Sequence, residues 1–381
     1  MKRVCIVTNY RNTGNYGAIL QAYALNKQIN DMGFYCETLN FYSERQNGNK
    51  LKRYLKRIKK GEIIYLFSDV KRDIGKMIVR KKMQIRRRSL DEFRYSIPHT
   101  KLYENDELHK LQYDYDGFVC GSDQIWRPTY EGNLIETYWL GNILNSTMKA
   151  SYAASIGIDK LSHLNEKKAK EYLESFSFVS VREKSAQDYL SSICNKQVYR
   201  VIDPVFLLNI NEWRKIENKT KINDRYILVY MIYGSSHLYK KIKEFAKKNK
   251  YKIVVFPYMA YYYRIYEQFF GDYKIYDATP GDFLSLIDNA EFVITDSFHA
   301  TAFSIIFHKK FAVATTNSKA ISRINNLLDI CDLRQNLLIK PYDINLVSIM
   351  DNTVNWSEVN ERIKREVFDS KEYLKTTLLS I

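Results

Sequence analysis

Residues 291–306 read EFVITDSFHATAFSII, an apolar strand-like run that passes directly into an apolar helix-like run. The junction between the two runs carries Asp296, Ser297 and His299. A strand followed at once by a helix is typical of βαβ units, in which such a junction falls at the carboxyl end of a parallel strand. The stretch therefore predicts an α/β fold, with an acid, a hydroxyl and an imidazole at an edge of the sheet where ligands bind.

Short apolar runs alternate with longer helical patterns along the chain, which is the rhythm of parallel α/β units. The first series lies at residues 3–8, 33–39, 116–120, 150–154, 178–181 and 197–201, and the second at 226–231, 252–256, 274–276, 291–295 and 311–314. The 381 residues are also more than one hydrophobic core usually sustains. We therefore predict two α/β domains, residues 1–205 and 206–381.

One segment makes the chain basic. Residues 50–88 hold 16 Lys and Arg against three acids, a local net charge of +13 within a total of +16. Apolar residues recur there at helical spacing, so we predict a basic amphipathic helical insertion at about residues 50–90. Its apolar stripe could pack on the first domain, or it could dock on an anionic membrane surface. No recognition motif for nucleic acid accompanies the charge, so nucleic acid is not expected as a partner.

Composition indicates a cytoplasmic protein. No apolar run approaches the roughly 20 residues of a membrane helix, and the N-terminal MKRVCIVTNY reads as a first strand rather than a signal peptide. Five scattered cysteines, without metal or redox spacing, fit buried thiols in a reducing compartment. The six histidines are isolated, so we expect no metal site.

The turn after the first strand is one candidate site. Residues 8–25 read TNYRNTGNYGAILQAYAL, with Gly14, Asn15 and Gly17 just before a helical pattern. Free backbone amides at a helix N-terminus form a ready site for an anion or a substrate. The stretch lacks the dinucleotide glycine spacing and the Walker lysine, so neither cofactor is supported, and an ordinary turn explains it equally well.

A denser cluster follows the third strand-like run, in YDGFVCGSDQIWRP at residues 115–128. It presents Ser122, Asp123, Gln124, Trp126 and Arg127 where ligands of open α/β sheets bind. The alternative is that Ser122 or Asp123 caps a helix while Trp126 packs in the core. We favour a binding function for this cluster.

Two further junctions carry charged side chains. Arg182 and Glu183 follow a short strand, where Arg182 could offer a two-pronged donor to an anion or simply pair with a nearby acid. At the junction of residues 291–306, His299 could shuttle protons near neutral pH beside a helix N-terminus. The alternative there is that Asp296 or Ser297 caps the helix and His299 is a core residue.

Six segments in a fixed order carry a resemblance to a known family. They are NYGAILQAYAL, GSDQIWRP, SYAASIG, SVREKSA, DPVFLL and TDSFHATAFSIIF, and they run from the N-terminus to about residue 330. As a set they resemble the polysaccharide pyruvyl transferase family. The resemblance implies two Rossmann-like domains facing each other across a cleft, a GT-B-like architecture. It also implies pyruvyl transfer from phosphoenolpyruvate to a sugar of a cell-surface polysaccharide or its precursor, forming a pyruvate ketal.

The resemblance assigns expected roles to the candidate residues. Arg182, Ser297 and His299 would bind the anionic donor, and His299 would also transfer a proton. Asp123 or Asp296 would be the base that activates a sugar hydroxyl. The acceptor is expected on the first domain, against residues of the two earlier clusters. These are Gly14, Asn15, Tyr16, Gly17, Gln124, Trp126 and Arg127.

One departure from the family pattern bears on the donor. Many members carry a Gly-x-Arg-x-His run, whereas this chain has Thr295 and Ser297 at the glycine and arginine positions. It therefore resembles the subset with Asp-Ser-Phe-His. Lys309 and Lys310 lie nearby in sequence and are candidates to replace the missing charge, although the helix is expected to point them away.

Two other functions are compatible with the same sequence. One is a GT-B-like glycosyltransferase with a nucleotide-sugar donor, and the other is a non-catalytic scaffold at the membrane in envelope polysaccharide assembly. For the transferase we expect no cofactor beyond phosphoenolpyruvate as substrate. We expect a place in capsule or exopolysaccharide biosynthesis, in the cytoplasm or on the inner face of the membrane. The acceptor sugar, and whether it is lipid-linked, stay open.

Overall fold

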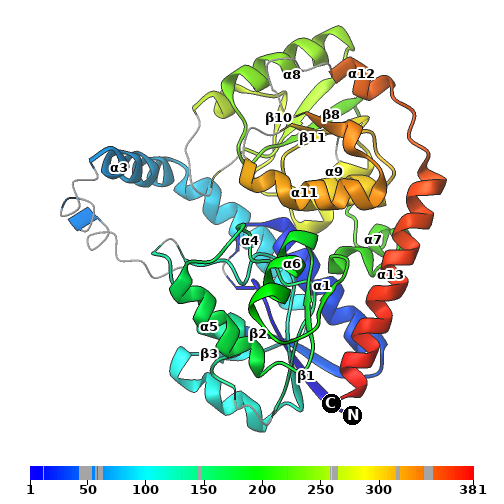
Figure 1. Cartoon of the computed structure of the whole chain (residues 1–381). Helices are drawn as coiled ribbons and strands as arrows, with labels where there is room; N and C mark the ends of the chain where they lie inside the picture. The colour runs from blue at the N-terminus through cyan, green and yellow to red at the C-terminus, as the bar shows by residue number, and fades with distance from the viewer. Residues whose placement is uncertain are drawn as a thin grey trace.

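The structure is a computed structural model in which two parallel sheets lie one above the other, each surrounded by helices (Figure 1). It describes residues 1–11, 13–42, 54–55, 58, 63–129, 131–143, 147–220, 222–257, 259, 265–314, 318–338 and 346–381. Part of the predicted basic insertion, residues 50–53, 56–57 and 59–62, lies outside the described residues.

The first sheet has the strand order β3-β2-β1-β4-β5, and all its pairs are parallel. Its strands are β1 (Arg3–Val7), β2 (Tyr35–Phe41), β3 (His99–Tyr103), β4 (Gly117–Cys120) and β5 (Met148–Ser151). A parallel pair, β6 (Val179–Val181) and β7 (Val198–Arg200), joins its far edge through isolated bridges from Ala150 and Ala154. The strand ends of β4, β6 and β7 therefore lie along one edge.

The second sheet has the order β10-β9-β8-β11-β12-β13 and is also parallel. Its strands are β8 (Tyr226–Tyr230), β9 (Lys252–Val255), β10 (Tyr273–Lys274), β11 (Phe292–Thr295), β12 (Phe311–Ala314) and β13 (Leu337–Leu338). Each of the eleven strand-like runs read from the sequence overlaps a strand, although 150–154 and 274–276 do so only in part, and the predicted α/β fold is confirmed. Two strands, β3 and β13, were not predicted.

Helices connect the strands and cover the sheets. The α-helices are α1 (Tyr16–Asp31), α3 (Ile63–Ile78), α4 (Arg80–Ser96), α5 (His163–Glu174), α6 (Lys184–Ile193), α7 (Ile210–Arg214), α8 (Ser236–Lys248), α9 (Pro280–Asp288), α10 (Phe298–Ile306), α11 (Ser318–Cys331), α12 (Leu346–Asp351) and α13 (Trp356–Leu379). Short 3-10 helices are η2 (Asn105–Tyr113), η3 (Glu136–Trp139), η4 (Pro204–Phe206), η5 (Ile265–Phe269) and η6 (Arg334–Asn336). No helix among the described residues is long and apolar enough to cross a bilayer.

The two halves of the molecule share one apolar core. Tyr16 and Leu20 of α1 belong to the same buried cluster as Phe283 of α9 and Phe303 of α10. The ring of Tyr16 stacks on that of Phe283, with centroids 4.8 Å apart and planes 4° from parallel. The junction between the halves is therefore a packed interior and not merely a hinge of polar residues.

Helix α4 runs between the two halves and ties them together (Figure 1). The guanidinium of Arg86 is buried and donates hydrogen bonds to the carbonyls of Pro257 at 3.2 Å and Ile275 at 3.0 Å, both in loops of the second half. On the same helix, Arg94 donates to the carbonyl of Thr13 at 3.3 Å. This part of the basic insertion thus packs on the molecule, and it does so through buried arginines and against the second half as well as the first.

The last helix returns from the second half to the first (Figure 1). Near its end, the Tyr373 hydroxyl donates to the carbonyl of Ser151 at 2.9 Å, and Ser370 accepts from the amide of Ile202 at 2.9 Å. Leu374 is buried against the first sheet. A division near residue 205 separates the two sheets, but α13 contacts both sides of it, and the independence of the two domains stays a prediction.

Candidate active site

Polar side chains from three strand ends of the first half meet the start of α10 from the second. Arg182 follows β6, Asp203 follows β7, and His299 lies in the first turn of α10 after β11. Arg182 Nη1 donates to Asp203 Oδ2 at 2.5 Å, and His299 Nε2 lies 3.8 Å from the same oxygen. All three side chains are buried, so they form one cluster at the junction of the halves. This is the crevice position that ligands occupy in open α/β sheets.

Arg182 is held on three sides. Its Nε donates to Glu183 Oε1 at 3.0 Å, and its guanidinium carbon lies 4.1 Å from the ring centroid of Phe298. Burial alone would lower its pKa, but Glu183 and Asp203 outweigh burial and raise the pKa above its usual value. The remaining nitrogen, Nη2, is buried and has no hydrogen-bond partner among the described residues. The guanidinium is therefore permanently charged and fixed in place, and its nitrogen Nη2 is left without a hydrogen-bond acceptor among the described residues.

Asp203 organises the cluster, although the sequence interpretation gave it no role beyond the DPVFLL segment. Its Oδ2 accepts from Ser122 Oγ at 2.8 Å as well as from Arg182, while its Oδ1 accepts from the amide of Val205 at 3.2 Å. The carboxylate thus caps η4 and positions Arg182 at the same time. Its neighbour Pro204 occupies the first turn of η4.

Asp123 is held near the same cluster. Its backbone has φ +73°, in the left-handed region that costs energy for any residue but glycine. Its Oδ2 accepts from Asn9 Nδ2, which follows β1, at 3.2 Å. Burial would raise the pKa of this carboxyl, but His299, Arg182 and the Gln124 amide together lower it. Asp123 is therefore an ionised carboxylate in an imposed geometry, as a base near a sugar hydroxyl would have to be.

His299 sits against a glycine that leaves room for it. A Cβ atom placed on Gly17 would lie 2.1 Å from His299 Nδ1, so only glycine fits at that point of α1. Burial lowers the pKa of the imidazole, and the opposing effects of Asp203 and Asp123 do not restore it. The free protein therefore holds a neutral imidazole at pH 7. Its Nε2 is buried with no hydrogen-bond partner among the described residues.

The side chains of Asp296 and Ser297 accept hydrogen bonds from backbone amides. Asp296 Oδ1 and Oδ2 accept from the amides of Ile232 at 2.5 Å and Tyr233 at 2.6 Å, in the loop after β8. Ser297 is the N-cap of α10, and its hydroxyl accepts from the amide of Ala300 at 3.5 Å. Both side chains are buried beside the cluster, and both hold the loops that shape it.

A second arginine, Arg323 of α11, completes the cluster and was missed by the sequence interpretation. Burial lowers its pKa and the nearby charge of Arg182 lowers it further, against Glu183 and Asp123. Its Nε is buried without a hydrogen-bond partner in the described part of the chain. Arg182 and Arg323 thus each keep a buried nitrogen without a partner among the described residues, and guanidinium donors of this kind bind anions. No motif surrounds Arg323, and only the fold reveals its position.

A family model for polysaccharide pyruvyl transferases matches residues 15–318, about four-fifths of the chain. The chain belongs to the polysaccharide pyruvyl transferase family. No curated protein sequence matches it.

Solved structures show the fold of this pyruvyl transferase family member. UDP-GlcNAc 2-epimerase from Neisseria meningitidis is 11% identical and superposes with a TM-score of 0.54, covering 100% of both chains. The putative 2-epimerase from Listeria monocytogenes is 10% identical with a TM-score of 0.54, covering 98% of this chain and 95% of that one. UDP-GlcNAc 2-epimerase from Methanocaldococcus jannaschii is 12% identical with a TM-score of 0.52, and the match covers 97% of this chain and 100% of that one. At these identities the similarity shows the architecture alone, which is GT-B-like as predicted.

In many pyruvyl transferases an arginine precedes the histidine by two residues, and this chain carries Ser297 there. The two lysines considered as substitutes point elsewhere, as expected. Lys309 Nζ donates to the carbonyl of Asp288 at 2.6 Å, and Lys310 Nζ donates to that of Met350 at 2.7 Å. Arg323 is the side chain that brings a second positive charge to the cluster.

The residues that the sequence assigned to an acceptor are dispersed in this member of the pyruvyl transferase family. Asn15 is the N-cap of α1, and Tyr16 is buried in the shared core. Trp126 is also buried, where its Nε1 donates to the carbonyl of Tyr138 at 2.8 Å. Arg127 is exposed and donates to Gln124 Oε1 at 3.0 Å. Gly14 lies in the loop before α1, and Gly17 contacts His299. Trp126 and Tyr16 are thus core residues, which is the alternative the sequence left open for Trp126.

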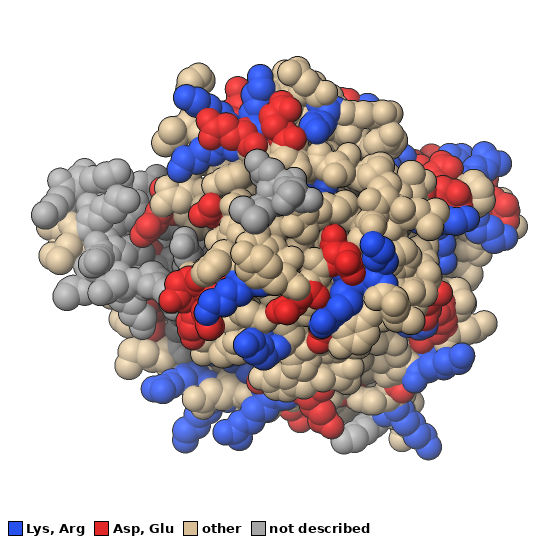
Figure 2. Space-filling view, turned by 90° about the horizontal axis from the view of Figure 1, so that it is seen from below, with Lys and Arg blue, Asp and Glu red and all other residues tan. Residues whose placement is uncertain are grey.

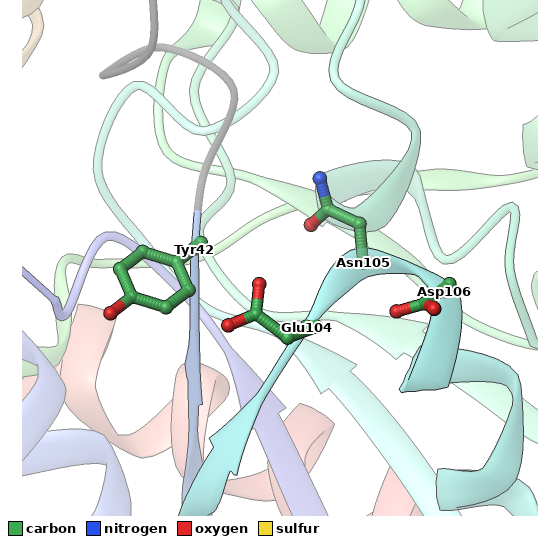
Figure 3. Close-up of a pocket in the computed structure, with 4 residues that line it drawn as sticks. All are labelled: Tyr42, Glu104, Asn105 and Asp106. Carbon is green, nitrogen blue, oxygen red and sulfur yellow. The ribbon is translucent and has the colours of Figure 1, made fainter.

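An open hollow of about 540 Å³ lies at the carboxyl ends of β2 and β3. It is lined by Tyr42, Glu104, Asn105 and Asp106, and the Glu104 side chain extends toward Tyr42 (Figure 3). Arg11 stacks its guanidinium over the Tyr42 ring at 4.5 Å. The hollow shares no residue with the arginine cluster but opens at the same edge of the first sheet as Asn9. Sequence reasoning did not identify it, because its residues come from two separate strand ends.

The described residues contain no group of three or more His, Cys, Asp or Glu side chains that could hold a metal ion. The expectation of a reaction without a metal stays a prediction.

Proposed function

We propose that this protein transfers the pyruvyl group of phosphoenolpyruvate to two hydroxyl groups of one sugar, in a cell-surface polysaccharide or its precursor. The observation that carries the proposal is a set of three buried nitrogens with no hydrogen-bond partner among the described residues. They are Arg182 Nη2, Arg323 Nε and His299 Nε2. Buried donors are normally paired, so an unpaired set in one cluster favours a ligand with several acceptor oxygens.

Phosphoenolpyruvate has the chemistry that such a set would bind. It carries a carboxylate and a phosphate, and arginine binds both groups through parallel N–H donors. The charge of Arg182 lowers the pKa of Arg323 in the free protein, and a bound anion with both a carboxylate and a phosphate would offset that repulsion. The family to which the chain belongs supports the same donor.

The reaction requires one proton to be delivered to carbon. Both hydroxyl oxygens of the sugar bond to C2 of the donor, the bond from C2 to the phosphate oxygen breaks, and the methylene carbon gains a proton to become methyl. One hydroxyl proton balances that gain, and the other leaves with phosphate. His299 is the group placed to give the proton once the bound donor has favoured its imidazolium form, because its Nε2 faces the cluster.

The structure favours Asp123 over Asp296 as the base. Asp296 accepts two short hydrogen bonds from the amides of Ile232 and Tyr233, which stabilise its charge and occupy its oxygens. Asp123 accepts from the Asn9 side chain and lies on the first half, where the acceptor is expected. The hollow lined by Tyr42 and Glu104 suits the hydroxyl groups and apolar faces of a sugar and not the anionic donor.

A nucleotide-sugar glycosyltransferase is a second candidate. Its support is the architecture alone, since a similar solved epimerase has UDP-GlcNAc bound. A purely structural scaffold is less well supported, because a scaffold has no need to bring Arg182, Asp203 and His299 together from both halves in one buried cluster.

Calorimetric titration with phosphoenolpyruvate tests the proposal. We expect saturable binding by the wild type, weakened roughly 10- to 150-fold in Arg182→Gln, Arg323→Gln and His299→Ala. Arg334→Gln, on the exposed η6, is the matched control and should bind normally. Binding of UDP but not of phosphoenolpyruvate would replace the proposal with the glycosyltransferase. Ketal formation is then checked by following phosphate release with candidate acceptors.

A further inference from the structure

Helix α3 turns its large apolar side chains outward. Phe67 and Met77 are 72% and 73% exposed, which is more than almost any other large apolar side chain in the described chain. They form part of one row with a spacing of three and four residues, so the row follows one face of the helix. Its exposed members are Ile63, Phe67, Val70, Ile74, Met77 and Ile78. We name these six residues the α3 face.

The acidic residues of the same helix are buried. Asp69 is 2% exposed and Asp73 is 7% exposed, and the hydroxyl of Tyr54 donates to Asp73 Oδ2 at 2.5 Å. A helix that packs only against its own protein does the reverse, with its apolar stripe inward and its charges in water. The exposed apolar row of α3 therefore indicates an apolar partner outside this protein chain.

The position of α3 fits an external partner. The helix stands out from the body of the molecule, while α4 runs back between the halves (Figure 1). Contiguous exposed apolar surface of this kind marks a site of interaction with a protein or a membrane. Arg86 and Arg94 show that α4 contacts the interior of the molecule, so the outward-facing helix of the insertion is α3.

Charge decides between the two kinds of partner. Residues 50–88, which include α3, carry a net charge of +13. Arg80 and Lys81 at the start of α4, directly after α3 in the chain, are exposed, and so are Arg87 and Arg88 further along α4. Elsewhere the charge is balanced, and on the face seen from below Lys and Arg alternate with Asp and Glu (Figure 2). Two copies joined through α3 would bring two such basic segments together, whereas an anionic surface is attracted to them.

We propose that the α3 face inserts into an anionic lipid surface and holds the protein on it. The apolar row enters the boundary between headgroups and acyl chains, and the basic side chains around it contact the anionic headgroups. The proposal does not rest on the transfer reaction, because docking requires neither donor nor acceptor. It narrows the anionic-membrane prediction for residues 50–88 to one helix face and removes the buried arginines of α4 from it.

Vesicle flotation of the full chain tests the proposal. Vesicles of phosphatidylcholine with 30% phosphatidylglycerol should carry the protein upward, and vesicles of phosphatidylcholine alone should carry far less. The double variant Phe67→Ser/Ile74→Ser should partition at least about tenfold more weakly. Its matched control is Phe368→Ser on α13, which removes an equally exposed phenylalanine and should partition like the wild type.

A charge variant and a salt series separate the two parts of the interaction. Arg87→Glu/Arg88→Glu should weaken partitioning by more than about 25-fold, at about fivefold for each basic residue. Lys167→Glu/Lys168→Glu on α5 is the control at exposed positions and should have little effect. Binding should fall as NaCl is raised, because the charge contacts are screened.

Two results would overturn the proposal. Partitioning that is equal on both kinds of vesicle and indifferent to salt would show that anionic lipid is not recognised. A wild type that ignores vesicles but sediments as a dimer, and becomes a monomer in Phe67→Ser/Ile74→Ser, would assign the α3 face to a second copy of this chain.

Discussion

At the residue scale, the site depends on the absence of a side chain at Gly17. His299 occupies the space where a Cβ of Gly17 would stand, so Gly17→Ala must push the imidazole away from Asp203. Gly17 is helical, so alanine suits its backbone, and the cost is overpacking of about 1–3 kcal/mol. We expect donor binding to weaken at least about tenfold while the protein stays folded by circular dichroism.

Gly14→Ala is the control for this substitution. A Cβ on Gly14 meets nothing within 4 Å, so donor binding should stay within about twofold of the wild type. Equal donor binding by Gly17→Ala and the wild type would mean that His299 can move without consequence.

The neutral state of His299 predicts a pH dependence of donor binding. Burial holds its pKa below the usual 6.5 in the free protein, and the negative charge of a bound donor favours the imidazolium and raises the pKa. Binding should therefore take up a proton and weaken as pH rises from 7 to 8.5, by up to about tenfold per unit. Calorimetry in two buffers of different ionisation enthalpy measures that proton.

His299→Gln should lose this dependence, because no imidazole remains to titrate. A proton uptake that persists in His299→Gln would assign the titration to another group of the cluster. The phosphate of the donor is fully ionised over most of this range, so it contributes little.

For single residues, the sequence predicted which strands end in polar or charged side chains. It also predicted Arg182, Asp123 and His299 as members of the site. Their roles stay predictions. It could not predict Arg323, which lies in a helix without a motif, or the central position of Asp203. Burial and a shared neighbour make those two residues significant, and neither property is visible in local sequence.

At the scale of elements, a partly buried carboxyl group in the loop after α7, that of Glu217, makes the stability of the fold depend on pH. Burial, with a smaller contribution from Asp288, raises the pKa of Glu217 to about 7. The folded state therefore keeps a proton that the unfolded state has released, so stability falls as pH rises from about 4.5 through 7. Glu217→Gln should be more stable than the wild type at pH 8, by about 1–2 kcal/mol once partial exposure is discounted.

Chemical denaturation at pH 8 and pH 4.5 measures this difference, which should disappear at the lower pH. Glu174→Gln at the exposed end of α5 is the control and should change nothing at either pH. A Glu217→Gln protein that is less stable at pH 8 would show that the carboxylate is ionised and paired there.

Strands were the elements that the sequence predicted best, because buried parallel strands are continuous apolar runs. The strand β3 reads HTKLY and lies at the edge of its sheet, so it lacks such a run. In the basic insertion, the apolar spacing predicted helices correctly. It could not predict whether the apolar face of each helix would be buried or exposed. Only the structure shows that α4 faces inward and α3 outward.

At the scale of the whole molecule, α13 fastens the end of the chain to the first sheet. Leu374 is 1% exposed there, so Leu374→Ala should lower the free energy of unfolding by about 2–5 kcal/mol. Hydrogen exchange should rise most in β1, β4 and β5, against which this end of α13 packs. Phe368→Ala, at an exposed position of the same helix, should cost about 0.5 kcal/mol or less.

An increase of exchange confined to the second sheet would contradict this account. It would mean that α13 is held by the half from which it departs and merely rests on the first sheet.

The apolar core that runs through the junction also restricts how relatives could exchange parts. A chimera joining residues 1–205 of one relative to residues 206–381 of another would pair a foreign α1 with α9 and α10, and a foreign α13 with β1 and β4. Tyr16 would then face a ring other than Phe283. Recombination can therefore succeed only between relatives that match at these contacts, so the two halves must be inherited together even though each carries its own sheet.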